Sequence, residues 1–238
     1  MVTLLLALPS MWTVDAASKG PGVADHVSKT IATYDRFAQD WVAVANNAEI
    51  EDWITDSIKR FAGWLPGLDV LVPGCGDGRD SVCLSQQGKT VHSFDLSAAM
   101  LQIARSRVDA GSLWQMDLRE LGSLQQCYAG IFASGCLYHL MPEEFIQFVA
   151  DAADRLTEQG VFYLNMKLGQ GMEMRHTPKP NYPGGATAQR LLQGDRFYAY
   201  YNEAQLEEIL LGRFNLQMKR MLAPHPEPVV EYFLVRKD

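Results

Sequence analysis

The sequence lacks any run of about 20 apolar residues, the length that a membrane-spanning helix requires. It also lacks a cluster of basic residues: its 21 lysines and arginines are scattered, and 28 acidic side chains leave a net charge of −7. Binding to a long nucleic-acid backbone needs clustered Lys and Arg. These absences favour a soluble protein with no membrane and no nucleic acid among its partners.

Cysteine is scarce, and its spacing does not suit a metal site or a disulfide framework. The four cysteines, Cys75, Cys83, Cys127 and Cys136, form no C-x-x-C pair and have no histidine nearby at the spacing of a zinc site. We therefore expect no metal. Free thiols suit a reducing compartment, which predicts a cytoplasmic protein.

The N-terminus lacks the positive charge that precedes the apolar core of an export signal. Residues 4–8 are apolar and Ala16-Ala17-Ser18 could serve as a cleavage site, but the first lysine is Lys19. The sequence therefore favours an N-terminal segment, residues 1–23, that packs on the domain or is poorly ordered, over a signal peptide.

The remainder, residues 24–238, has the composition of one globular domain, with 47% hydrophobic and 21% charged residues overall. Residues 24–46 and 49–64 predict two helices, which would form an N-terminal helical cap over 24–65. Short apolar runs then alternate with helical stretches, the pattern of βαβ units around a parallel sheet. We expect strands at 68–72, 90–94, 112–116, 128–133 and 161–166, helices at 79–87, 98–108 and 142–157, and a short turn at 118–124.

Residues 168–201 interrupt this alternation. Three prolines and five glycines fall between residues 168 and 195, with few apolar clusters, as in an active-site loop or lid. An aromatic, strand-like run follows at 196–201. We therefore expect an insertion that covers a site.

The C-terminal part returns to regular structure, with a helix at 203–211 and an antiparallel pair of strands at 214–221 and 229–236. The predicted fold is α/β, with a mostly parallel sheet, helices on both faces and an antiparallel C-terminal strand.

A glycine-rich turn, Pro73-Gly74-Cys75-Gly76-Asp77-Gly78-Arg79, joins the first predicted strand to the helix after it. Glycine permits positive φ and lets backbone N–H groups approach a ligand closely. A dinucleotide fingerprint would have its third glycine where Arg79 stands, so the spacing favours an adenosyl ligand over a nicotinamide cofactor. Taken alone, the turn could equally be a tight connection.

The next two strands also end in residues suited to a nucleoside. Asp95 could accept both hydroxyl hydrogens of a ribose; its alternative role, capping the next helix, suits Ser97 better. Met116 could lie against a purine while Asp117 meets the amino group of the purine, although Asp117 could instead cap the turn that follows. Since open α/β sheets bind ligands at the carboxyl ends of their strands, we expect one shared site.

Together these segments resemble the class I S-adenosylmethionine-dependent methyltransferases. The resemblance covers roughly residues 30–236, with one departure at Ala129, where the family commonly has an Asp. It implies a Rossmann-like class I methyltransferase fold and S-adenosyl-L-methionine as cofactor. The residues that it implies for cofactor binding are Tyr34, Pro73, Gly74, Cys75, Gly76, Gly78, Arg79, Asp95, Leu96, Met100, Met116, Asp117, Leu118, Ala133, Ser134 and Gly135.

The implied chemistry is in-line displacement of the sulfonium methyl by an acceptor lone pair, with a base where the acceptor is a hydroxyl or a protonated amine. His139 is the candidate base, because an imidazole titrates near neutral pH. Tyr34 is expected to close over the sulfonium, and Lys167 to orient an anionic acceptor. The alternatives are core packing for Tyr34, a structural loop role for His139 and a strand-end role for Lys167.

The predicted function is methyl transfer to an O, N or S atom of a small molecule, because the insertion could enclose a compact pocket, in a monomer or homodimer. One alternative is methylation of a macromolecule such as tRNA or protein; the net charge opposes the nucleic-acid version. Another is a non-catalytic sensor or scaffold that binds the same cofactor, because a fold alone does not fix a function.

Overall fold

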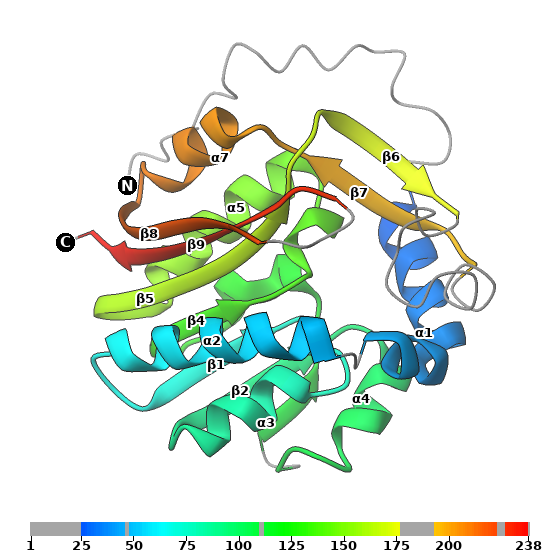
Figure 1. The fold of residues 1–238 in the computed structure, drawn as a ribbon, viewed down its shortest axis with the longest axis horizontal. Coiled ribbons are helices and arrows are strands. Elements are labelled where there is room, and N and C mark those ends of the chain that lie inside the picture. The colour runs from blue at the N-terminus through cyan, green and yellow to red at the C-terminus, as the bar shows by residue number, and fades with distance from the viewer. Residues whose placement is uncertain (1–24, 46–47, 110–111, 177–192, 223–226, 238) are drawn as a thin grey trace.

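The computed structural model describes residues 25–45, 48–109, 112–176, 193–222 and 227–237. Its strands, in chain order, are β1 (Asp69–Pro73), β2 (Thr90–Asp95), β3 (Leu113–Gln115), β4 (Tyr128–Ala133), β5 (Leu156–Lys167), β6 (Gly171–Arg175), β7 (Arg196–Tyr200), β8 (Phe214–Leu222) and β9 (Val229–Arg236). Seven of them form the central sheet, in the order β3-β2-β1-β4-β5-β9-β8 (Figure 1). β1 to β5 run parallel, and β9 is antiparallel to both of its neighbours, β5 and β8. The predicted mostly parallel sheet with an antiparallel C-terminal strand is confirmed.

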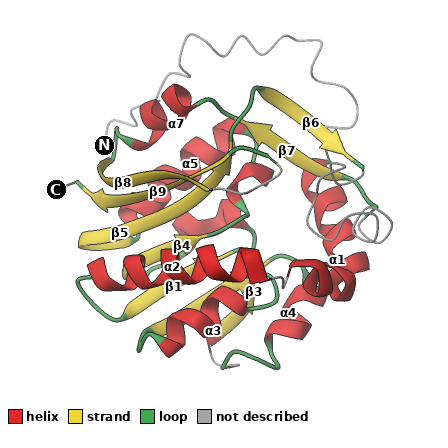
Figure 2. Ribbon diagram, in the orientation of Figure 1, coloured by secondary structure: helices red, strands yellow, loops and turns green. Residues whose placement is uncertain are grey.

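Helices cover both faces of the central sheet, as predicted (Figure 2). The helices are α1 (His26–Ala45), α2 (Ala48–Trp64), α3 (Arg79–Gln86), α4 (Ala98–Ala104), α5 (Pro142–Asp154) and α7 (Glu203–Leu210), with short 3-10 helices η3 (Leu118–Ser123) and η4 (Leu137–His139). Within β1, Val70 and Val72 pack in the cluster of α2, α3 and α4, whereas Leu71 packs in the cluster of α5 and α7. Buried on both faces, β1 is therefore continuously apolar.

The two helices predicted as an N-terminal cap occupy different places. α2 packs on a face of the sheet through Ile58 and Phe61, which are fully buried. α1 lies beyond the carboxyl ends of the strands, in contact with α4 and β7 (Figure 1). Only α1 is thus placed like a lid over the strand ends.

Several predicted bounds are wrong. The helix predicted over 98–108 already ends at Ala104. The helix predicted over 142–157 ends at Asp154, because Leu156 is buried and pairs with Tyr128 as the start of β5. The stretch 168–195, predicted to lack regular structure, contains β6, which pairs with β7 in a separate two-stranded sheet. The predicted N-terminal segment, residues 1–23, lies outside the described residues. So do residues 177–192, which belong to the predicted insertion.

Candidate functional site

A cavity of about 260 Å³ lies where the carboxyl ends of the parallel strands meet α1. The loops after β1, β2, β3 and β4, the end of β5, and side chains of α1 and α2 line it. This is the edge at which open α/β sheets bind ligands. The residues predicted for cofactor binding that line the cavity are Tyr34, Gly74, Cys75, Gly76, Arg79, Asp95, Leu96, Met100, Met116, Asp117, Leu118, Ser134 and Gly135.

Three residues predicted for cofactor binding, Pro73, Gly78 and Ala133, are not among the lining residues. Ala133 is fully buried at the end of β4. The Pro73 carbonyl accepts a hydrogen bond from the thiol of Cys136 at 3.4 Å, and burial raises the pKa of that thiol. Pro73 and Ala133 therefore support the wall of the cavity from behind.

The three glycines of the predicted turn all have positive φ, between 54° and 83°. A Cβ at Gly74 would lie 2.6 Å from the Cβ of Cys136, and one at Gly78 would lie 2.7 Å from Val108. A Cβ at Gly76 would meet nothing within 4 Å, although Gly76 lines the cavity. Packing thus requires glycine at the first and third positions, whereas the second leaves open space that an adenosyl ligand could fill.

The carboxylate of Asp95 holds this turn in place. It accepts hydrogen bonds from the backbone N–H groups of Gly76, at 2.9 Å, and Ser97, at 2.8 Å. Burial raises the pKa of Asp95 above its ordinary value, and these N–H donors oppose that shift. A carboxylate has about four acceptor positions, so Asp95 can serve the turn and still accept ribose hydroxyls. Ser97 caps α4, accepting from the N–H of Met100, as predicted.

At the end of β3, the structure shows one of the two alternative roles of Asp117 directly. Its side chain accepts from the backbone N–H of Arg119 and caps η3, and it forms an ion pair with the Arg119 guanidinium at 2.6 Å. The capping role is therefore present in the structure. Met116 is buried and also lines the cavity. It therefore lies where the predicted contact with a purine requires it.

Asn165 is a site residue that the sequence analysis did not single out. Its side-chain oxygen accepts from the N–H of Gly135 at 2.9 Å, and its amide donates to the hydroxyl of Ser134 at 3.1 Å. Asn165 is buried on β5 and lines the cavity. Asn165 therefore fixes the Ser134–Gly135 loop. The sequence analysis could not find this role, because no local pattern links residues that are 30 positions apart.

Asp35 ties α1 to the start of α4. Its carboxylate accepts from the hydroxyl of Ser97 at 2.6 Å and from the N–H of Ala99 at 3.1 Å. A negative charge at a helix N-terminus is favourable, because the N–H groups of the first turn point toward it. This contact places the neighbouring Tyr34 in the wall of the cavity.

Tyr34 and His139 form a hydrogen-bonded pair between α1 and η4. The Tyr34 hydroxyl lies 2.9 Å from Nε2 of His139, and Nδ1 of His139 lies 2.5 Å from the carbonyl oxygen of Phe197. Since a carbonyl only accepts, Nδ1 carries the proton, so the hydroxyl of Tyr34 donates to Nε2. Burial lowers the pKa of His139 to about 3, which keeps the imidazole neutral.

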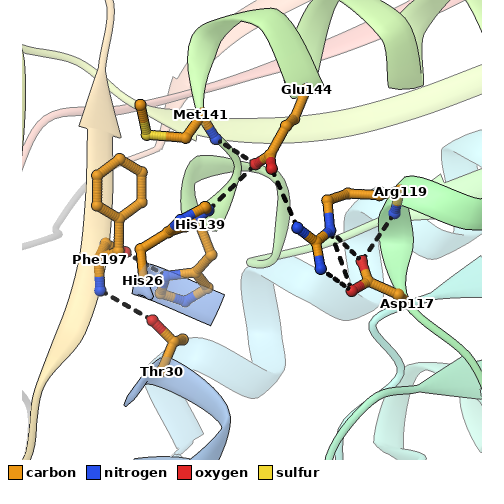
Figure 3. A network of polar contacts seen from close by, with 8 residues as sticks. All are labelled: His26, Thr30, Asp117, Arg119, His139, Met141, Glu144 and Phe197. Carbon is orange, nitrogen blue, oxygen red and sulfur yellow. Dashed lines mark hydrogen bonds and ion pairs between the residues drawn. The ribbon is translucent and has the colours of Figure 1, made fainter. Parts of the chain in front are cut away.

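Figure 3 shows a second network, centred on Glu144 at the start of α5. Its carboxylate lies 3.1 Å from the imidazole of His26 on α1 and accepts from Arg119, at 3.3 Å, and from the N–H of Met141, at 2.8 Å. Burial alone would raise the pKa of Glu144, but the hydrogen bonds from His26 and Met141 outweigh it and lower the pKa. Because Arg119 also binds Asp117, the network fixes α1, α5 and η3 to one another.

Lys167, at the end of β5, is buried and lines the cavity. Its ammonium group forms an ion pair with the buried Glu227 and lies 4.6 Å from the ring centre of Tyr198 and 5.3 Å from that of Tyr138. Glu227 also accepts from Arg175 at 2.9 Å. Tyr34, His139 and Lys167, the three predicted catalytic residues, therefore line one cavity.

Comparison with known proteins gives a family match within the sheet region. Residues 70–160 match the family model described as a methyltransferase domain. A protein of Geobacillus sp. (strain WCH70) named as a methyltransferase is 27% identical over 143 residues, 56% of this chain and 57% of that protein. The malonyl-[acyl-carrier protein] O-methyltransferase of Pectobacterium atrosepticum is 30% identical over 121 residues, 48% of this chain and 43% of that protein. The chain thus matches about half the length of these curated relatives.

Solved structures share the fold at low sequence identity. The N-methyltransferase NodS from Bradyrhizobium japonicum WM9, in complex with S-adenosyl-L-homocysteine, has a TM-score of 0.66 and 14% identity, covering 88% of this chain and 100% of that one. Magnesium protoporphyrin IX methyltransferase from Synechocystis PCC 6803, with the same bound ligand, has a TM-score of 0.62 and 19% identity, covering 90% and 99%. The fold is thus that of the class I methyltransferases, and residues 70–160 within it match a methyltransferase domain. Among the described residues, no helix is long and apolar enough to cross a membrane.

Proposed function

We propose that this chain transfers a methyl group from S-adenosylmethionine to a small-molecule acceptor. The observation that carries the proposal is one cavity whose lining includes both the glycine turn with Asp95 and the group formed by Tyr34, His139 and Lys167. One set of residues is suited to an adenosyl ligand and the other to a second reactant. A direct transfer requires that the two reactants be held side by side in one space.

The residues of β1 to β3 would hold the cofactor. Asp95 would accept the ribose hydroxyls, Gly76 would leave room for the ligand close to the backbone, and Met116 would lie against the purine. When bound, S-adenosylmethionine supplies an electrophilic methyl group on a positively charged sulfur. Asn165 would keep the Ser134–Gly135 loop in position beneath that group.

We assign Tyr34 and His139 a positioning role. His139 is a weak base, because burial lowers its pKa to about 3, so removing a proton from a neutral hydroxyl is not a task that suits it. Its Nε2 instead accepts the hydroxyl hydrogen of Tyr34, which holds the Tyr34 ring in the wall of the cavity. An acceptor whose reacting atom already has a free lone pair, such as an anionic oxygen or an unprotonated amine, fits this site.

A label-transfer assay tests the proposed function. The protein is incubated with methyl-labelled S-adenosylmethionine and a panel of small oxygen and nitrogen acceptors, tRNA and a protein mixture. We expect label in the small-molecule fraction, S-adenosylhomocysteine in equal amount, and loss of both in Asp95→Ala. Label in tRNA or protein alone would replace the proposal with methylation of a macromolecule. Tight cofactor binding with no label in any fraction would favour a sensor.

A further inference from the structure

We propose that Glu231, a buried residue of β9 outside the cavity, is a positioning residue for the cofactor site. Through Tyr163 and Asn165 it sets the direction of the hydrogen bonds at the Ser134–Gly135 loop, so that the hydroxyl of Ser134 donates toward the bound cofactor. The inference rests on the proposed methyl transfer, because it assigns this hydroxyl to S-adenosylmethionine. Its basis is a network of hydrogen bonds behind the cavity wall.

Glu231 lies behind the wall and not in it. Its side chain is fully buried, and neither Glu231 nor Tyr163 is among the described residues that line the cavity. Glu231 is the cross-strand partner of Asn165 in the antiparallel pairing of β5 with β9, so both side chains are on one face of the sheet. Asn165 does line the cavity. The two strands therefore bring a buried carboxylate next to a residue of the cavity wall.

The network begins at a group that only accepts. The carboxylate of Glu231 forms an ion pair with Arg220 of β8 and accepts from the hydroxyl of Tyr163 at 2.9 Å. Burial raises the pKa of Tyr163 well above its ordinary value, so the hydroxyl keeps the proton that it donates. Because Glu231 takes this single proton, the oxygen of Tyr163 can only accept from a further partner.

Asn165 is held in one orientation from two sides. Its side-chain oxygen accepts from the N–H of Gly135 at 2.9 Å, and its amide group donates to the oxygen of Tyr163 at 3.4 Å and to that of Ser134 at 3.1 Å. The opposite orientation of the amide would set two donors against each other at Gly135. It would also set two acceptors against each other at Tyr163, because the proton of that hydroxyl is used by Glu231.

At Ser134 the network reaches the cavity. Ser134 lines the cavity, and its oxygen accepts from Asn165. Among the described residues, none accepts the proton of the Ser134 hydroxyl. A hydroxyl has one proton to donate, so this one remains for a ligand in the cavity.

The direction of these bonds depends on Glu231. If the residue at this position could donate, the hydroxyl of Tyr163 would be free to donate to Asn165, and the amide could turn over at the cost of its contact with Gly135. The hydroxyl of Ser134 would then donate to the amide oxygen and away from the ligand. A buried ion pair is weak evidence for a role in stability, whereas a fixed direction of hydrogen bonding explains why a carboxylate lies here.

Calorimetric titration with S-adenosylhomocysteine tests the inference. Ser134→Ala removes the donor and should weaken binding by roughly tenfold, whereas Ser134→Thr keeps a hydroxyl and should restore most of the affinity. Glu231→Gln and Tyr163→Phe leave the donor in place but release its direction, so each should weaken binding by roughly threefold to fivefold. The control Tyr232→Phe removes a buried hydroxyl of β9 that has no hydrogen-bond partner among the described residues, and it should bind normally.

Combined variants show whether Glu231 acts through Ser134. In the Ser134→Ala background, Glu231→Gln should cause no further loss of affinity, because the hydroxyl that it directs is gone. A merely structural role of Glu231 would weaken binding equally in both backgrounds. Melting curves show which variants are folded. If Glu231→Gln does not fold, the same cycle with Tyr163→Phe, which removes a single hydroxyl, decides the question.

The outcomes separate the two proposals. Failure of S-adenosylhomocysteine to bind to the native chain would overturn the proposed function itself. Binding by the native chain, with unchanged affinity in Ser134→Ala or with equal losses in both backgrounds of the cycle, would overturn the role of Glu231 alone.

Discussion

At Gly76 the backbone has a φ of +54°, yet an added Cβ would meet no protein atom within 4 Å. Gly88, at the end of α3, has a φ of +76° and equally open surroundings, but it does not line the cavity. The two glycines therefore form a matched pair: their backbone requirement is alike, and only Gly76 faces the space assigned to the ligand.

Substituting each with alanine should separate stability from binding. We expect Gly76→Ala and Gly88→Ala each to lower the free energy of unfolding by about 1–2 kcal/mol, the cost of an L-residue in the left-handed region. Only Gly76→Ala should weaken S-adenosylhomocysteine binding, because its methyl group enters the ligand space. Urea unfolding and calorimetric titration measure the two effects. Equal binding by both variants would contradict the placement of the ligand at this turn.

The lowered pKa of His139 has a consequence for stability. In the folded chain His139 stays neutral down to about pH 3, whereas in the unfolded chain it takes up a proton as the pH falls through about 6.5. The unfolded state then binds more protons than the folded state, so stability is lost as the pH falls from about 6.5 toward 3. For one group the loss reaches about 1.4 kcal/mol per pH unit.

Comparing the native chain with His139→Gln isolates this contribution from those of the other histidines. We expect the difference in unfolding free energy between the two proteins to shrink steadily between pH 7 and pH 5, measured by urea unfolding at each pH. A difference that stays constant over this range would mean that His139 titrates at its ordinary pKa and lies in a wetter environment than the structure shows.

Most of the residues that line the candidate site could be predicted because each follows a strand or belongs to a glycine turn. The roles that the sequence analysis missed depend on distant partners. Asn165 acts on Gly135, 30 positions away, and Tyr34 meets His139 across 105 positions. A residue's own sequence neighbourhood contains no signal for such a partner. For His139, the sequence indicated a base near neutral pH, whereas burial makes it a weak one.

At the scale of elements, α1 is held mainly by polar contacts, and neither of the apolar clusters of the described core includes a residue of α1. Asp35 joins it to the N-terminus of α4, and Thr30 accepts from the N–H of Phe197 on β7 at 3.0 Å. Elements that lie outside the apolar core open more easily than the core of the sheet. α1 is therefore suited to move aside when ligands enter and leave.

Asp35→Ala should loosen α1 selectively. Losing two hydrogen bonds to one exposed carboxylate is expected to cost about 1–2 kcal/mol. Hydrogen exchange should become faster in α1 and at the start of α4, while β1 and β4 keep their protection. Asp40→Ala, on the same helix, serves as the control. Uniformly faster exchange throughout the sheet would contradict the view that Asp35 stabilises α1 and not the central sheet.

Element boundaries show where periodicity is a reliable guide. Helices and strands with long apolar patterns, such as α2 and β4, lie where the sequence predicts them. β6 was missed because it has only five residues and lies in a glycine- and proline-rich stretch. It is a strand because its backbone pairs with β7, and its own sequence contains no signal for that pairing. The early start of β5 has the same cause, a pairing with Tyr128.

At the scale of the whole molecule, the class of fold could be predicted, since alternating strands and helices permit few other arrangements. The order of the strands and the joining of α1 to α5 and β7 could not, because they depend on contacts between distant positions. Val70 pairs with Gly130 between β1 and β4, and His26 of α1 contacts Glu144 of α5. The resulting architecture gathers residues from β1 to β5 and α1 around one cavity.

A calorimetric titration with S-adenosylmethionine, S-adenosylhomocysteine and NADH tests the central claim, binding of an adenosyl cofactor at this cavity, most directly. We expect one molecule of either adenosyl ligand to bind per chain and NADH not to bind. Asp95→Ala should weaken binding by about 2 kcal/mol, roughly thirtyfold, through lost ribose contacts. The control Asp69→Ala, at the opposite end of the sheet, should bind normally. Binding of NADH without either adenosyl ligand, or unchanged affinity in Asp95→Ala, would contradict the account.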